Sequence, residues 1–134
     1  MIYTIYNSIR TPDGTYLTCE HNHDFKVHPD KVSGETYMND GLGYCIRRSV
    51  NKAPYIDFAV NSEHDHELQR EYFKWGTYGK DGKQEKKYVL LKDMSNIHIE
   101  NIIRTQKHFK GTYIEELFMN ELAYRKDNNI LIKD

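Results

Sequence analysis

The chain has 134 residues and a formal net charge of −1, with 29% charged and 38% hydrophobic residues. This length suits one globular domain with a core of ordinary size. The near-neutral charge argues against general nucleic-acid binding, because domains with that function carry a strongly basic face. The sequence has no apolar run of 18 residues and no basic start followed by an apolar stretch. It therefore predicts neither a membrane span nor a signal peptide.

Two cysteines, Cys19 and Cys45, fall within segments that we expect to be strands. In a protein that is not exported, such thiols stay reduced and behave as small hydrophobic side chains. We therefore expect the protein in a cytoplasm.

The first sixty residues predict an antiparallel sheet. β-Branched and aromatic residues dominate 3–9 and 15–19, and the segment Thr-Pro-Asp-Gly at 11–14 has the composition of a tight turn. This pattern predicts a hairpin over 3–19. Short strands are expected over 35–38 and 44–48, joined by a turn at 39–41, and a less regular strand over 55–60.

The hydrophobic period changes after residue 60. Ser62 can cap a helix, and Leu68, Tyr72 and Trp75 follow at i, i+4 and i+7 as one apolar stripe. The glycine-rich segment WGTYGKDGKQ then predicts a loop, and the apolar run at 88–91 is typical of a strand.

Two C-terminal helices are predicted over 95–107 and 112–127. Ser95 is a favourable N-cap with Met94 placed to contact Ile99, and Gly111 ends the first helix. Thr112 and Glu115 form a capping-box pattern before the second helix. Its expected buried stripe is Ile114, Leu117, Phe118 and Leu122.

These elements predict an α+β fold, in which an N-terminal antiparallel sheet of hairpins packs with two C-terminal helices. We expect a single domain over 1–134. It comprises the sheet over 1–60, a helix, a glycine-rich loop and a short strand over 62–92, and the two helices over 95–127.

The segment CEHNHD, residues 19–24, concentrates metal-ligating side chains. Strand alternation would place Cys19, His21 and His23 on one face, and two such imidazoles can chelate zinc. No CxxC, HxxxH or HExxH motif supplies the remaining ligands, so we expect no metal and no cofactor. We interpret the segment as a pocket edge or a strand end. A small metal-dependent enzyme using His21, His23 and Asp24 stays an alternative.

Catalytic motifs are absent from the sequence, whereas residues suited to binding are present. Neither Gly-x-Ser-x-Gly nor a Walker loop occurs, so we expect no enzyme. Guanidinium groups capture phosphate, and aromatic faces beside cations suit a nucleobase. The predicted ligand-binding residues are Arg47, Arg48, His21, His23, Trp75, Tyr78, Lys80 and Lys83.

Seven segments carry a resemblance that spans nearly the whole chain: YNSIRTPDGTYL, HNHDF, GETYMNDG, YCIRRSVN, WGTYGKDGKQ, LKDMSNIHIENII and ELAYRK. In this order they resemble a family of small proteins encoded by phages and prophages. The resemblance implies an accessory protein that counters host defence in the cytoplasm of the host cell.

The predicted outline is also similar to the anti-Thoeris sponge of phages, which has an N-terminal antiparallel sheet and two C-terminal helices. That protein forms oligomers that sequester a cyclic ADP-ribose isomer without cleaving it. The analogy implies a homo-oligomer that binds a small cyclic nucleotide immune signal. The alternative is a protein–protein inhibitor of a host defence or toxin component.

Overall fold

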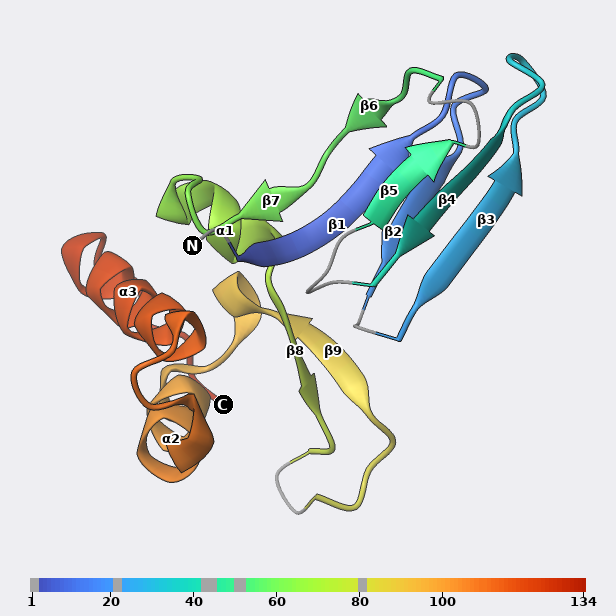
Figure 1. Ribbon diagram of the computed structural model, residues 1–134. Helices are drawn as coiled ribbons and strands as arrows, with labels where there is room; N and C mark the ends of the chain where they lie inside the picture. The colour runs from blue at the N-terminus through green and yellow to red at the C-terminus, as the bar shows by residue number, and fades with distance from the viewer. Residues whose placement is uncertain (1–2, 21–22, 42–45, 50–52, 80–81) are drawn as a thin grey trace. The chain divides into compact units, whose positions relative to one another are not determined.

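The computed structural model describes residues 3–20, 23–41, 46–49, 53–79 and 82–134 (Figure 1). The chain divides into two compact units, residues 1–64 and 65–134. Antiparallel strands make up the first unit, and the second holds the helices and one further hairpin, which confirms the predicted α+β class. The predicted change from sheet to helix at residues 60–62 lies close to the junction of the units. A single domain over the whole chain stays a prediction.

The first unit begins with the predicted hairpin. Strands β1 (Thr4–Arg10) and β2 (Tyr16–Cys19) pair antiparallel. The turn between them is closed by the N–H of Gly14, which donates to the Thr11 carbonyl at 2.9 Å, and Gly14 adopts a φ of +90°. On its other edge β1 pairs with two short strands, β6 (Ile56–Asp57) and β7 (Val60–Asn61). These two strands replace the single strand predicted over 55–60.

A second sheet in this unit has the order β3-β4-β5, formed by β3 (Phe25–Pro29), β4 (Thr36–Asp40) and β5 (Ile46–Ser49). The predicted turn at 39–41 is wrong at its start, because Asn39 and Asp40 still pair with β5, and only Gly41 leaves the strand with a φ of +71°. Strand β3 was not predicted from the sequence. Its apolar residues Phe25 and Val27 are about half exposed, as suits a strand at a sheet edge.

Apolar and polar contacts join the two sheets of the first unit. Ile9, Leu17 and Tyr37 form its buried cluster. Between the sheets, the side-chain amide of Asn39 donates to the Leu17 carbonyl at 2.8 Å, and the Cys19 thiol donates to the Asn39 carbonyl at 3.3 Å. Cys19 is a free, buried cysteine, as expected from the sequence, whereas Cys45 lies outside the described residues. Burial raises the pKa of Cys19 to about 11, so this thiol is protonated at neutral pH.

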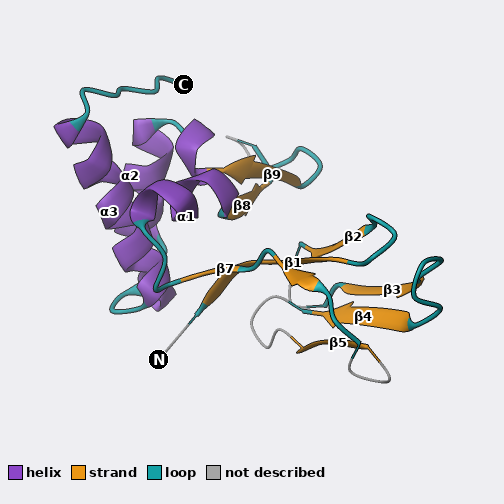
Figure 2. Ribbon diagram, turned by 90° about the horizontal axis from the view of Figure 1, so that it is seen from above, coloured by secondary structure: helices purple, strands orange, loops and turns teal. Residues whose placement is uncertain are grey.

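In its described residues, 65–79 and 82–134, the second unit contains three α-helices, a two-stranded sheet and two short 3₁₀ turns (Figure 2). They are α1 (His66–Tyr72), β8 (Lys74–Thr77), β9 (Lys87–Leu90), η1 (Leu91–Asp93), α2 (Asn96–Thr105), η2 (Lys107–Phe109) and α3 (Tyr113–Asp127). Strand β9 confirms the strand predicted at 88–91. Among the described residues, none of the helices is long and apolar enough to cross a membrane.

Helix α1 differs from the helix predicted after Ser62. It begins at His66, after Asp65 as N-cap, and ends at Tyr72, so Trp75 lies in β8. The predicted apolar stripe of one helix is wrong, because only Leu68 and Tyr72 belong to α1, and these two side chains are each 39% exposed. Residues 74–77 are not helical because they pair with β9 as strand β8. The local hydrophobic period of the sequence does not predict such pairing.

Helix α2 agrees with its prediction at the N-terminus. The Ser95 hydroxyl accepts the N–H of His98 at 3.1 Å, and both Met94 and Ile99 are buried. The helix ends at Thr105, and η2 separates it from Gly111, which has a φ of +76°.

Helix α3 buries Leu117 and Phe118 as predicted, but it does not use the predicted capping box. The hydroxyl of the N-cap residue Thr112 donates to the Phe109 carbonyl, and Glu115 accepts the N–H of Gly111 at 3.3 Å. Both side chains therefore bond to the chain before the helix, Thr112 to the last residue of η2 and Glu115 to Gly111.

Candidate ligand-binding pocket

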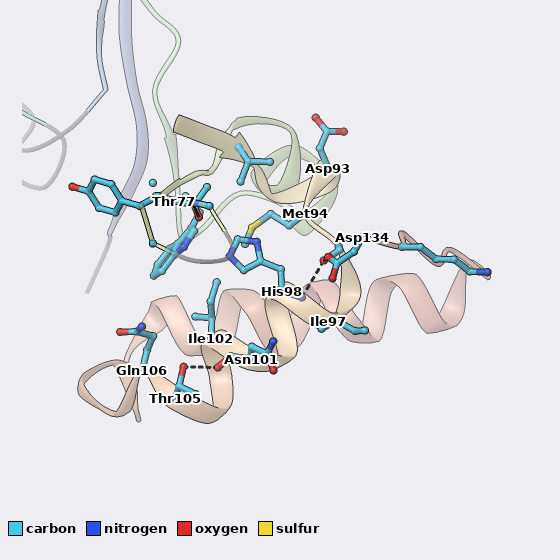
Figure 3. Close-up of a pocket in the computed structure, with 18 residues that line it drawn as sticks. Thr77, Asp93, Met94, Ile97, His98, Asn101, Ile102, Thr105, Gln106 and Asp134 are labelled. Carbon is cyan, nitrogen blue, oxygen red and sulfur yellow. Dashed lines mark hydrogen bonds between the residues drawn. The ribbon is translucent and has the colours of Figure 1, made fainter. Parts of the chain in front are cut away.

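The second unit contains a pocket of about 830 Å³, bounded by the β8–β9 hairpin, α2 and the C-terminal segment (Figure 3). Its apolar and aromatic lining consists of Trp75, Tyr78, Val89, Met94, Ile97 and Ile102. Its polar side chains are Thr77, Asp93, Ser95, His98, Asn101, Thr105, Gln106, Lys133 and Asp134. An apolar cavity of this size with a few convergent polar groups is the usual form of a small-molecule site.

Strand alternation builds the hairpin wall. Trp75 pairs with Val89, and residues two apart on a strand point to the same face, so Thr77 joins them on the wall of the pocket. The indole of Trp75 packs edge-on against Phe118, at 5.3 Å between ring centroids, and against Phe109, at 5.7 Å. These contacts fix the indole before any ligand binds.

Helical spacing builds the opposite wall. His98, Asn101, Ile102 and Thr105 lie at i, i+3, i+4 and i+7 of α2, which is one face of the helix. The side-chain oxygen of Asn101 accepts a hydrogen bond from Arg104 at 2.7 Å. This bond orients the amide and leaves its NH₂ group as the donor presented by this residue.

The C-terminal segment closes the third side. The Ser95 hydroxyl donates to the Asp134 carboxylate at 2.5 Å, and the N–H of Ile132 donates to the Asn96 side chain at 3.0 Å. These bonds hold the segment beside the first turn of α2. Burial lowers the pKa of His98 below its usual value, with Asp134 opposing that shift, so the imidazole is neutral at pH 7.

The structure brings two of the predicted ligand residues together in this pocket. Trp75 and Tyr78 both line it, with Tyr78 52% exposed. Lys83 is exposed on the same hairpin but is not part of the lining. Lys80 lies outside the described residues.

The other predicted ligand residues belong to the first unit. Arg47 and Arg48 lie on β5, each paired with a residue of β4. His23 is exposed, and His21 lies outside the described residues. Their part in binding stays a prediction.

The segment CEHNHD joins β2 to β3. Cys19 is the last residue of β2, and the Asp24 carboxylate accepts the N–H groups of Glu20 at 2.9 Å and Phe25 at 3.0 Å. The bond from Glu20 is the main reason that the pKa of Asp24 is lowered. In the described residues of this segment, the acidic side chain thus orders a connection between two strands, which agrees with the strand-end interpretation.

A cluster that the sequence analysis missed is formed by Asp13, His28 and Asp30, whose potential metal-ligating atoms all lie within 4.8 Å of one another. The Asp13 carboxylate accepts the N–H of Thr15 at 3.0 Å and contacts His28 Nε2 at 2.7 Å. Asp30 accepts the N–H groups of Asp13 at 2.8 Å and Ser33 at 2.7 Å. Two carboxylates and an imidazole are side chains that can bind a cation. These bonds connect two turns, and those from Thr15 and His28 hold the pKa of Asp13 well below its usual range.

Comparison of the chain with protein-family models, curated proteins and solved structures finds no match. The resemblance to a phage-encoded family therefore stays a prediction. The chemistry of the pocket carries the functional argument.

Proposed function

We propose that the protein is a non-catalytic binding protein that sequesters a small ligand containing a nucleobase. A cyclic nucleotide immune signal, bound as part of a phage countermeasure to host defence, is the biological role that the sequence resemblance suggests. The observation that supports the proposal is the pocket of about 830 Å³ lined by Trp75 and Tyr78, since both residues were expected to contact a nucleobase.

The walls of the pocket suit a flat heterocycle. Trp75 is held edge-on by Phe109 and Phe118, so its indole offers a preorganised surface for stacking. Stacking of a base on an aromatic side chain contributes about 1–3 kcal/mol. The amides of Asn101 and Gln106 line the opposite wall and can pair with the polar edge of such a ring.

The polar groups of the pocket favour binding over hydrolysis. A serine nucleophile needs a base within hydrogen-bond reach of its hydroxyl. The Ser95 hydroxyl instead donates to Asp134 and accepts the backbone N–H of His98, and no imidazole among the described residues bonds to it.

Calorimetric titration with cyclic ADP-ribose isomers and with cyclic di- and trinucleotides tests the proposal, followed by chromatography of the ligand released on denaturation. We expect one class to bind and to be recovered unchanged. Trp75→Leu should weaken binding by about tenfold or more, as loss of one stacking contact implies. Tyr88→Leu is the matched control, because Tyr88 pairs with Gly76 on the other face of the same hairpin. Failure of every class to bind would refute the proposal, and a chemically changed ligand would indicate an enzyme.

A second candidate function rests on an exposed apolar patch of the first unit. Tyr16, Ile56 and Phe58 are 57%, 52% and 42% exposed, and the rings of Tyr16 and Phe58 lie 5.7 Å apart. Arg10 pairs with both Tyr16 and Ile56, so these side chains share one face of the sheet. Such a patch suits a protein–protein inhibitor. This function would be favoured if a folded Tyr16→Ser/Phe58→Ser protein no longer protects the phage from host defence, whereas the Trp75→Leu protein still does.

A further inference from the structure

The charges around the pocket are mostly negative. Among the described residues, the side chains that line it include two carboxylates, Asp93 and Asp134, and one ammonium group, Lys133. No arginine belongs to the described lining. Phosphate sites in proteins use guanidinium groups, lysines or converging backbone N–H groups. A phosphate inside this pocket would face more carboxylates than cations, so electrostatics disfavour an anionic group there.

His98 lies in the middle of this arrangement. Its ring points from α2 into the space between the helix and the β8–β9 hairpin (Figure 3). Within the described part of the chain, its imidazole makes no hydrogen bond, and the backbone N–H of His98 donates to the Ser95 hydroxyl. A neutral imidazole has one donor and one acceptor nitrogen, which matches the donor–acceptor edge of a nucleobase.

The elements around His98 provide the groups that respond to its charge. Tyr78 faces the pocket from the hairpin, Asp93 from η1, and Lys133 and Asp134 from the C-terminal segment. Burial opposes a charge on the ring and Asp134 favours it, and burial is the larger effect. Protonation would convert the acceptor nitrogen of His98 into a second donor, and the match to a base edge would be lost.

We propose that this pocket holds the uncharged nucleobase of the ligand, with the neutral imidazole of His98 as its specificity-determining contact, and that the phosphate groups of the ligand stay outside the pocket. This inference rests on the proposed function. It adds the orientation of the ligand and the group that recognises its base.

The orientation is tested by calorimetric titration with adenosine, AMP and ADP at low and high salt, beside the cyclic nucleotides used above. We expect the three affinities to agree within about threefold and to change little with salt, because phosphates outside the pocket make few charged contacts. ADP that binds more than about tenfold tighter than adenosine, and loses this advantage in salt, would overturn the inference and leave the proposed function standing. Binding of a cyclic nucleotide without binding of adenosine would likewise overturn the inference and leave the proposed function standing. Failure of every probe would overturn both.

The role of His98 is tested with two variants that are first shown to keep the unfolding midpoint of the wild type. His98→Leu should weaken adenosine binding about tenfold at pH 7.5, since it removes both polar atoms of the ring. His98→Gln keeps a donor and an acceptor and should bind within a few-fold of the wild type. Wild-type binding should weaken as the pH falls below 6.5, whereas binding to His98→Gln should not. Equal affinities of His98→Leu and wild type, or the same pH profile in all three proteins, would overturn the role of His98.

Discussion

The substitution Glu121→Gln tests the charged core of the second unit. Glu121 is fully buried in α3, and its carboxylate accepts two hydrogen bonds from Arg70, at 2.8 and 3.0 Å. It also accepts one from Arg125 at 2.7 Å and contacts His66 Nε2 at 2.9 Å. Glutamine has nearly the same shape, but it would leave Arg125, 1% exposed, without a carboxylate partner.

Two arguments give the same magnitude for this loss. Breaking a buried ion pair by removing one partner costs about 3–5 kcal/mol. Burial alone would raise the pKa of Glu121, but bonds from its three partners outweigh it and lower the pKa from its ordinary value of 4.5 to about 2. At about 1.4 kcal/mol for each pKa unit, this corresponds to about 3 kcal/mol of stability. We therefore expect Glu121→Gln to lower the free energy of unfolding by about 3 kcal/mol at pH 7.

Urea unfolding followed by circular dichroism measures this change, and Glu116→Gln is the matched control. Glu116 lies on the same helix and is exposed, so its loss should cost less than about 1 kcal/mol. Because the folded pKa of Glu121 is depressed, its stabilising effect is present above pH 4.5 and is lost as the pH falls toward 2. The two variants should therefore differ in stability at pH 7 and converge near pH 2. Equal stability at pH 7 would refute the view that the carboxylate holds this core together.

Further changes probe other parts of the chain. Leu117→Ala should cost about 2–5 kcal/mol in urea unfolding, because Leu117 is 4% exposed, and a loss below about half a kcal/mol would contradict its burial. Tyr37→Phe should cost about 1 kcal/mol in the same assay, since the hydroxyl of this residue donates to the Pro54 carbonyl at 2.9 Å. Elemental analysis after dialysis should find no stoichiometric zinc, and about one zinc per chain that disappears in His21→Ala/His23→Ala would contradict this expectation.

Local signals in the sequence account for the elements that were predicted. The turn chemistry of residues 11–14 requires only adjacent residues, and the hairpin formed as expected. The capping hydroxyl of Ser95 and the apolar spacing of Leu117 and Phe118 likewise act within one helix. Each of these signals reflects a contact between residues that are close in sequence.

The missed elements depend on contacts between distant residues. Trp75 has a helical spacing from Leu68 and Tyr72, yet its partner is Val89, fourteen residues further along the chain. Buried charge was missed for the same reason, because Glu121 reads as an ordinary solvent-exposed residue of α3 until α1 brings Arg70 to it.

The residues of the candidate site also separate into those predicted from the sequence and those that depend on contacts between distant residues. The aromatic residues Trp75 and Tyr78 were predicted from composition, and they line the pocket. The contributions of His98 and Asn101 were not predicted, because polar residues on one face of a helix are typical of a solvent-exposed surface. Only the β8–β9 hairpin, placed opposite that face, makes it the wall of a pocket.

One residue of the charged core, Arg125, connects that core to the elements that form the pocket walls. Arg125, held by Glu121, donates to the Leu91 carbonyl at 2.9 Å and to the Asn96 side-chain oxygen at 2.7 Å, and that oxygen also accepts the N–H of Ile132. One guanidinium group thereby fixes η1, the start of α2 and the C-terminal segment, which supply pocket walls. Glu121→Gln should therefore weaken the binding of adenosine at pH 7 in the absence of urea, although Glu121 is not part of the pocket lining. Unchanged affinity in a folded Glu121→Gln protein would show that the walls keep their positions without this network.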